Sequence, residues 1–237
     1  DPCITFSNGK KAIIDHCSFS WSVEENVNIT DVDSVTMQWC IISESLYSST
    51  HVKGARAYGA QLGGEHSSYH HNLWAHHNTR MPRNNGNTSN DYQLTWDYRN
   101  NVHYNWGNPE AFYGGGIEQP GGYVHSNIIN NFFKPGPATT TIKEQQYFCA
   151  PSGGRTEVVG EGNEYLYGYG LWYLSGNVMC DNSVKTENNW LGLKGPIEHQ
   201  YYSEFEAAPV TTTSAYDAYE QVLSDAGATK PKRDFID

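Results

Sequence analysis

YRNNVHYNWG, residues 98–107, carries the pattern that decides the fold: a short strand, a turn rich in asparagine and a second short strand. Comparable pairs of short strands, bounded by Gly, Asn, Asp or Ser, occur on both sides of it. They are KKAIIDHCSFSWS (10–22), DSVTMQWCIISES (33–45), SSYHHNLWAHH (67–77) and GGYVHSNIINNFFK (121–134). The chain therefore repeats one strand–turn–strand unit.

When the units are aligned on Cys17, Cys40, Asn72, Asn101 and Asn127, the steps between them are 23, 32, 29 and 26 residues. A period in the twenties with insertions of variable length is typical of a parallel β-helix, in which each coil stacks on the last. Asparagine suits the stacked turns because it tolerates the left-handed conformation and bonds to its neighbour. A β-sandwich also has regularly spaced strands, but it does not repeat this asparagine punctuation. We predict an all-β chain, a right-handed parallel β-helix with long loops.

The sequence changes character in its last third. Residues 148–210 are rich in Gly, Tyr and Asn, and we interpret them as long loops and the last coils. Residues 214–227 predict a short amphipathic helix packed on the β-helix, with Ser214 as N-cap and Gly227 as C-cap. We treat residues 1–237 as one domain. Because residue 1 lies almost inside a strand, we expect preceding coils, from an N-terminal segment of the same gene product, to complete an otherwise monomeric β-helix.

Composition narrows the class of partner and the compartment. The formal net charge is −11 and no basic stripe offsets it, which disfavours a nucleic-acid partner. No apolar run approaches the ~20 residues that a membrane span needs, so we predict no membrane partner. Five cysteines without zinc-binding spacing favour a secreted, periplasmic or cell-surface protein. Cys149 and Cys180 are the disulfide pair that we favour.

Five short motifs occur together: I-D-H at 14–16, H-x-K-G at 51–54, H-H-N at 70–72, R-x-P-R at 80–83 and N-N-V-x-Y-N-W at 100–106. Each motif alone is weak, but the combination is specific. With it the chain resembles the pectate lyase superfamily, polysaccharide lyase family one, over nearly its whole length. The resemblance implies a lyase that cleaves α-1,4-linked polygalacturonate, or pectin, by β-elimination and leaves 4,5-unsaturated oligogalacturonides.

The resemblance also implies roles for basic residues. Arg80, in the R-x-P-R motif, matches the base that removes the C5 proton of galacturonate, and Lys53 matches a lysine that contacts the substrate carboxylate. Arg83 is a candidate for binding another carboxylate or for a scaffold ion pair, and Arg56 for the same anionic subsite or for a solvated surface position. Arginine is a poor base, with an ordinary pKa of about 12.5 or above, so we expect an alkaline activity optimum.

Calcium is the cofactor that the resemblance implies, held by acidic residues on a strand that precedes the basic ones. The family's two strand ligands match Glu24 and Asn28, and a further acid falls near Asp1. Apolar and polar residues alternate in this strand, so Glu24, Asn26 and Asn28 are expected to share its outer face and to offer oxygen to Ca²⁺. Because Asn28 replaces an acid, we expect weaker calcium binding or completion by Glu25, Asp1 or the substrate.

The sequence is also compatible with other functions. A calcium-independent pectin lyase acting on methylated pectin is the nearest alternative, and a non-catalytic carbohydrate-binding β-helix is another. A polygalacturonase would require clustered Asp pairs on neighbouring coils, and the sequence has no N-T-D, D-D or G-H-G run. Adjacent histidines on a strand point to opposite faces, so we interpret His16 and His71 as stacked structural residues rather than metal ligands.

Overall fold

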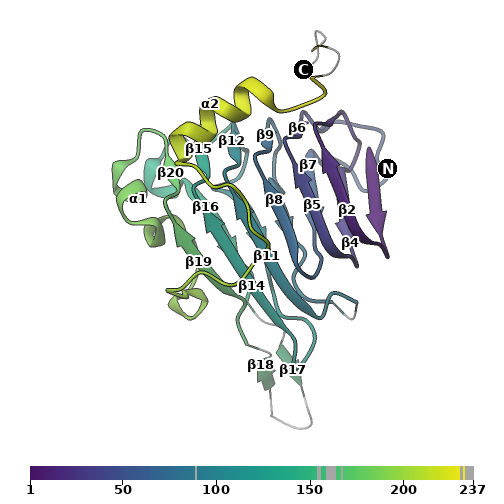
Figure 1. Cartoon of the computed structure of the whole chain (residues 1–237), viewed down its shortest axis with the longest axis vertical. Helices are drawn as coiled ribbons and strands as arrows, with labels where there is room; N and C mark the ends of the chain where they lie inside the picture. Colours follow the sequence, from purple (N-terminus) through teal and green to yellow (C-terminus); the bar gives the residue numbers. More distant parts are fainter. Residues whose placement is uncertain (89, 154–155, 159–163, 167, 230–231, 233–237) are drawn as a thin grey trace.

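Three parallel sheets wind around a common axis in a computed structural model that describes residues 1–88, 90–153, 156–158, 164–166, 168–229 and 232 (Figure 1). Each sheet receives one strand from every coil, and all neighbouring strands within the three sheets are parallel. The chain is a right-handed parallel β-helix, as the repeat of strand–turn–strand units predicts.

The three sheets contain six strands each. Sheet A consists of β1 (Ile4–Ser7), β4 (Glu25–Thr30), β7 (Tyr58–Leu62), β10 (Arg83–Asn84), β13 (Glu110–Gly114) and β16 (Tyr147–Pro151). Sheet B consists of β2 (Lys10–Asp15), β5 (Asp33–Gln38), β8 (Ser67–His70), β11 (Gln93–Arg99), β14 (Tyr123–Ile129) and β19 (Leu171–Ser175). Sheet C consists of β3 (Ser18–Ser20), β6 (Ile41–Ser43), β9 (Leu73–Ala75), β12 (Val102–Tyr104), β15 (Phe132–Lys134) and β20 (Val178–Met179). A hairpin of β17 (Thr156–Val158) and β18 (Glu164–Leu166) stands apart from them.

An asparagine ladder connects the turns between sheets B and C. Each side-chain amide donates to the side-chain oxygen of the next rung, over 2.9–3.1 Å, in the order Asn72, Asn101, Asn131, Asn177, Asn189. The side-chain oxygen of every rung after the first also accepts the backbone N–H of the rung before it. Buried polar groups cost little when they are paired in this way, so the ladder fixes the register of successive coils.

The sequence alignment was wrong at one rung, because the ladder passes through Asn131 and not Asn127. Asn127 lies in the middle of β14, points away from the core and bonds to the C-terminal segment. The correct position follows from the turn, since Asn131 directly precedes β15 as Asn101 directly precedes β12.

Apolar side chains from all three sheets fill the interior of the β-helix. The largest fully buried ones are aromatic, and Trp96 stacks on Tyr98 with ring centroids 4.7 Å apart and an interplanar angle of 12°. His16 and His71 stack on opposite sides of Trp39, at 6.0 Å and 4.4 Å, which confirms their structural role.

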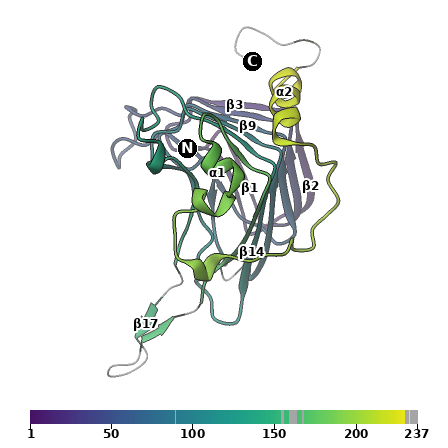
Figure 2. The same cartoon turned by 90° about the vertical axis from the view of Figure 1, so that its left-hand side faces the viewer.

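Helices cover one end and one flank of the β-helix (Figures 1 and 2). The short α1 (Ser183–Glu187) and the 3-10 turn η2 (Asn189–Gly192) close the end where the last coils lie; two further 3-10 turns are η1 (Lys143–Gln145) and η3 (Ile197–His199). The predicted C-terminal helix is present as α2 (Ala215–Asp225), with Ser214 as its N-cap, and it packs on sheet C through Ala215, Val222 and Ala226. In the described part of the chain, no helix is long and apolar enough to cross a membrane.

The predicted disulfide between Cys149 and Cys180 is wrong, since all five cysteines carry free thiols. Cys149 is buried in the core on β16, whereas Cys180 follows β20 and packs against the cluster beneath α2. The two residues belong to different sheets, which a Gly- and Tyr-rich sequence does not reveal.

Candidate active site

One row of side chains crosses the outer face of sheet A. The register pairs Asn28 with Gln61, Gln61 with Arg83, and Arg83 with Tyr113. Their strand neighbours inside, such as Val27, are fully buried in the core. The alternation in the sequence therefore placed Asn28 correctly on the outer face.

Asn26 does not share that face, contrary to the prediction. Its side chain is fully buried and donates to the carbonyl oxygens of Phe19 at 3.0 Å and Ser43 at 2.7 Å. It lies where the chain passes from sheet C to sheet A, and there the amide satisfies two stacked strand ends. The chain bends at residues 23–24, directly before β4, and the alternation of buried and outward residues holds only from Val27 onward.

Arg80 occupies the centre of the face, just before β10, with a left-handed backbone φ of 59°. Its Nε donates to the Tyr113 hydroxyl at 3.2 Å, and its Nη1 donates to the Glu25 carboxylate and to Gln61 Oε1, the latter at 3.4 Å. The guanidinium also lies over the ring of Tyr58, 4.4 Å from the centroid. Four side chains from three strands therefore hold the predicted base at the surface, with 17% of its side chain exposed.

Arg56 joins the same cluster from the loop before β7. Its Nη2 lies 3.3 Å from Glu24 Oε1, and His51 Nε2 lies 3.4 Å from the other oxygen of that carboxylate. Its Nη1 donates to the Tyr58 hydroxyl at 3.2 Å, and its guanidinium lies 5.0 Å from the centre of that ring. The hydrogen bond to Tyr58, and then the attraction of Glu24 and Glu25, raise the pKa of Arg56 above its ordinary value. Arg56 is therefore a permanent cation beside Arg80.

The three remaining predicted residues lie at the margin. Arg83 makes one long hydrogen bond, 3.4 Å to Gln61 Oε1, and lines a hollow of about 360 Å³ with residues 114–116. Lys53 is exposed on the loop whose His51 contacts Glu24, and the structure gives its side chain no ion pair. Asp1 is exposed too, and only its backbone carbonyl is engaged, by Ser22.

The site contains the types of oxygen donor that calcium prefers, but its two carboxylates are already bonded to arginines. Asn28 Oδ1 is buried and has no hydrogen-bond partner among the described residues, so it is an oxygen that can accept a cation. Glu24 and Glu25, by contrast, are each paired with an arginine. No group of three His, Cys, Asp or Glu side chains converges among the described residues. The donor set thus suits Ca²⁺ chemically, provided that the guanidinium groups give up the two carboxylates.

Sequence reasoning missed the aromatic and amide residues that organise the cluster, namely His51, Tyr58, Gln61 and Tyr113. A usable signal existed for Gln61, because Ala60 and Leu62 are apolar neighbours in an alternating strand, so Gln61 must face outward. Tyr58 and Tyr113 could not be distinguished from the other tyrosines, since 17 of them are spread along the chain.

Comparison with known proteins identifies relatives by sequence. The chain is 32% identical over 167 residues to a protein named probable pectate lyase C from Aspergillus terreus, a match that covers 70% of this chain and 32% of the relative. A protein of the same name from Aspergillus flavus is 35% identical over 135 residues, which cover 56% of this chain and 28% of the relative. The chain thus spans about a third of the length of the curated relatives it matches. No protein-family model matches it.

Solved structures share the fold. A pectate lyase from Bacillus sp. N165, in complex with trigalacturonate, superposes with a TM-score of 0.52 at 16% identity and covers 92% of this chain and 59% of that one. Pectate lyase C from Erwinia chrysanthemi, solved with Ca²⁺, gives the same score and identity and covers 95% of this chain and 59% of its own. At this level of identity the likeness establishes the architecture.

Proposed function

We propose that this chain, a relative of the pectate lyases by sequence and by fold, cleaves α-1,4-linked polygalacturonate by β-elimination and leaves 4,5-unsaturated oligogalacturonides. The observation that carries the proposal is the cluster on sheet A. It brings Arg80, Arg56 and Arg83 to one exposed face of a chain whose formal net charge is −11. A polyanion would be attracted to this face in spite of the overall charge, because fixed cations act locally.

The proposed reaction assigns the proton to Arg80. The C5–H bond of a galacturonate unit breaks, its proton passes to a guanidine nitrogen of Arg80, and its electron pair forms the C4–C5 double bond. The C4–O bond breaks at the same time, the leaving oxygen takes a proton from water, and the proton on Arg80 then neutralises the hydroxide so formed. Arg80 must be neutral to start, and an arginine side chain is ordinarily a cation, so activity is expected to rise toward alkaline pH.

Arg56 and Arg83 would bind substrate carboxylates on either side of the reacting unit, and Lys53 would approach from its exposed loop. Withdrawing charge from the carboxylate acidifies C5 and stabilises the enediolate that develops there. A planar guanidinium suits this task because its fork of N–H donors matches a carboxylate.

We propose calcium as the cofactor, with Glu24, Glu25 and Asn28 as its protein ligands. Bound there, it would supply a Lewis acid that polarises the substrate carboxylate. Glu24 and Glu25 currently balance Arg56 and Arg80, so releasing them requires another anion for the arginines. Substrate carboxylates provide that anion, and each ligand should therefore strengthen binding of the other by the same factor.

The decisive experiment follows the ultraviolet absorbance of the conjugated product during incubation with polygalacturonate, with calcium and then with chelator. We expect product only with calcium, and Arg80→Lys should abolish turnover but leave polygalacturonate binding within about threefold. New reducing ends without the conjugated double bond would refute elimination. Unchanged turnover by Arg80→Lys would remove Arg80 from the mechanism.

A calcium-independent lyase acting on methylated pectin is the second candidate. It is favoured by the engagement of both Glu24 and Glu25 with cations. Turnover of methylated pectin that persists in chelator would select it. In either case the substrate is a polymer too large to enter a cell, so we propose that the protein acts outside one.

A further inference from the structure

The C-terminal segment 201–213, here called the strap, crosses the outer face of sheet B before it enters α2 (Figures 1 and 2). This face is separate from the cluster of arginines on sheet A. Polar side chains of sheet B rather than apolar ones hold the strap, so its path is set by directional contacts.

The strap is anchored firmly at both ends. Asn127 accepts the backbone N–H of Phe205 at 3.0 Å and donates to its carbonyl oxygen at 2.9 Å. Arg99 donates to Glu204 at 2.8 Å and to Thr212 Oγ1 at 3.2 Å. The positions of residues 205–208 are thus fixed relative to the sheet below them.

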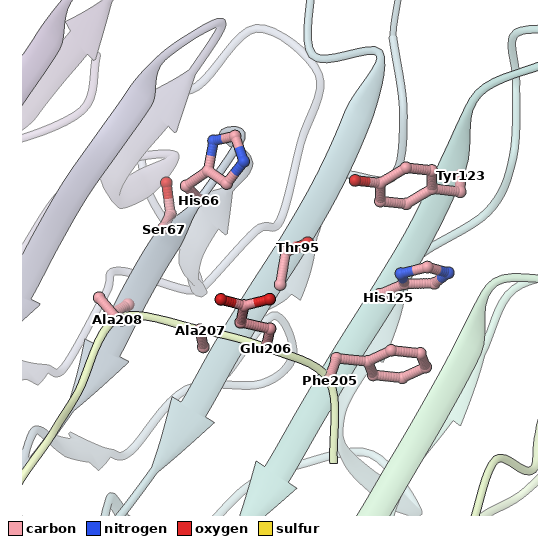
Figure 3. A pocket seen from close by; sticks show the side chains of 10 residues that line it. His66, Ser67, Thr95, Tyr123, His125, Phe205, Glu206, Ala207 and Ala208 are labelled. Atoms are coloured by element: carbon pink, nitrogen blue, oxygen red, sulfur yellow. The ribbon is translucent and has the colours of Figure 1, made fainter. Parts of the chain in front are cut away.

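A pocket of about 580 Å³ lies between this part of the strap and sheet B (Figure 3). Its volume falls within the range of about 300–1,000 Å³ that is usual for ligand sites. Its lining comes from the beginning of β8, from β11 and β14, and from the strap, namely His66, Ser67, Ser68, Thr95, Tyr123, His125 and residues 205–208. Because the strap is anchored, the pocket is formed before any ligand arrives.

Aromatic rings build one wall. His125 lies between Tyr123 and Phe205, at 4.2 Å from each and nearly parallel to both. Phe205 stacks in turn on Tyr201 at 4.6 Å. The stack is rigid, and Tyr123 at its end extends its hydroxyl toward the opposite side of the pocket, where His66 lies (Figure 3).

Polar groups without protein partners line the rest. Within the part of the chain that the structure describes, the side chains of Ser68, Thr95 and Glu206 form no hydrogen bond, although Ser68 and Thr95 are 3% and 8% exposed. His66 is held by Asp33 at 3.0 Å. Hydroxyls, imidazoles and one carboxylate beside an aromatic wall are groups that match the alternating hydroxyls and C–H faces of a sugar.

The charge of this pocket disfavours polygalacturonate, the substrate proposed for the arginine cluster on sheet A. No Lys or Arg is among the described residues that line the pocket, and Glu206 supplies a negative charge. Burial lowers the pKa of His125, which keeps that imidazole neutral near pH 7. An anionic galacturonate unit would meet Glu206 with no cation to offset the repulsion. A neutral sugar would instead donate hydroxyl groups to that carboxylate.

We propose that this pocket is an accessory binding site for neutral saccharide units, separate from the arginine cluster on sheet A. The inference does not depend on the chemistry proposed for Arg80. It assigns the strap a function in forming a binding site as well as in covering sheet B.

Binding is tested on the full chain with three neutral tetrasaccharides, β-1,4-galactotetraose, cellotetraose and α-1,5-arabinotetraose, and with trigalacturonate. Calorimetry would give affinities, and the imidazole NMR signals of His66 and His125 would locate the bound sugar. We expect at least one neutral probe to saturate the protein and shift both signals. Thr95→Val and Glu206→Gln should each weaken that probe about tenfold, since the first removes a hydroxyl from a buried position and the second replaces a charged acceptor with a weaker neutral one.

Glu187→Gln on α1 is the matched control, because it removes an exposed carboxylate that does not line the pocket and should leave affinity unchanged. Thr95→Val keeps the shape of the side chain, so a melting curve like that of the parent protein shows that a loss is due to the hydroxyl. Failure of all three neutral probes to bind at about 10 mM would overturn the proposal. So would trigalacturonate shifting the two imidazole signals while the neutral probes do not, or equal effects of Glu206→Gln and Glu187→Gln.

Discussion

The outer faces of sheets A and B carry the same kinds of residue but use them differently. On sheet A, Arg83 donates one side-chain hydrogen bond, of 3.4 Å, within the described part of the chain and lines an open hollow. On sheet B, Arg99 bonds to Asp97 through two nitrogens and to Glu204 and Thr212 of the strap. Both arginines project from a parallel sheet, and only the second is covered by the chain.

A scaffold arginine differs from one that can bind a ligand in how many of its N–H donors already bond to the protein. Burial opposes the charge on Arg99, but its bonds to Asp97 outweigh that effect and raise its pKa above the ordinary value. Four of its five N–H donors bond to the protein. The donors of Arg83 remain largely free, and they face the region where a polyanion would lie.

Matched substitutions of the two arginines give the largest expected effect on stability. Arg99→Met leaves Asp97 buried without its partner, and we expect a loss of about 3–5 kcal/mol in the free energy of unfolding. Arg83→Met should change it by less than about 1 kcal/mol, because its one contact is long and partly exposed. Urea unfolding of both variants measures the difference.

The same pair should behave in the opposite way in polygalacturonate binding, where Arg83→Met is the damaging change. Equal stability losses in the two variants would mean that the strap does not distinguish the two faces. The two faces would then differ only in how exposed their arginine side chains are.

The sequence predicts the strand repeat and the uncovered face of sheet A better than the face of sheet B that the strap covers. Strand alternation placed Asn28 outward, and the spacing of R-x-P-R brought Arg80 and Arg83 to the same cluster. These features depend on residues near one another in a coil or on adjacent coils. The strap could not be predicted, because Asn127 and Phe205 are 78 residues apart and no local pattern links them. The pairing of Arg80 with Glu25 could not be predicted for the same reason, since these residues are 55 positions apart.

Acid should weaken the support of the sheet A face through His77. This buried imidazole binds Ser45 Oγ at 2.6 Å and the Ile42 carbonyl at 3.0 Å, at the base of the loop that carries Arg56. Burial lowers the pKa of His77 to about 4, whereas an unfolded histidine titrates near 6.5. Between these values the unfolded chain binds the proton first. The contribution is therefore complete above about pH 6.5 and is lost as pH falls toward 4, up to about 3 kcal/mol.

Unfolding free energies at pH 7, 5.5 and 4 would show this loss in the parent protein. His77→Gln cannot titrate, so its stability should depend less on pH over the same interval. Parallel pH curves for the two proteins would assign the acid sensitivity to other groups.

Asn127 on the covered face and Asn28 on the uncovered face should show the same contrast with smaller changes in stability. Asn127 makes hydrogen bonds to Asp97 and to both backbone groups of Phe205, so Asn127→Ala should cost about 2 kcal/mol. Asn28→Ala should cost nearly nothing, because it removes an oxygen that has no partner. Thermal unfolding compares them, and calcium titration in the presence of oligogalacturonate should show weaker binding only for Asn28→Ala. A stability loss of similar size in both would contradict the assignment of Asn28 to the uncovered face.

The junction of the strap and α2 gives the smallest expected effect. Ser214 directly follows the anchored Thr213, and its hydroxyl oxygen accepts the Asp217 N–H at 3.1 Å as the N-cap of α2. Ser214→Ala should therefore cost about 1 kcal/mol in urea unfolding. Glu220→Ala is the control, since it shortens an exposed side chain inside the same helix, where alanine is favoured. If Ser214→Ala also increased hydrogen exchange at the Phe205 amide, the strap and α2 would unfold as one unit. Exchange confined to α2 would show that Asn127 and Arg99 hold the strap independently of the helix.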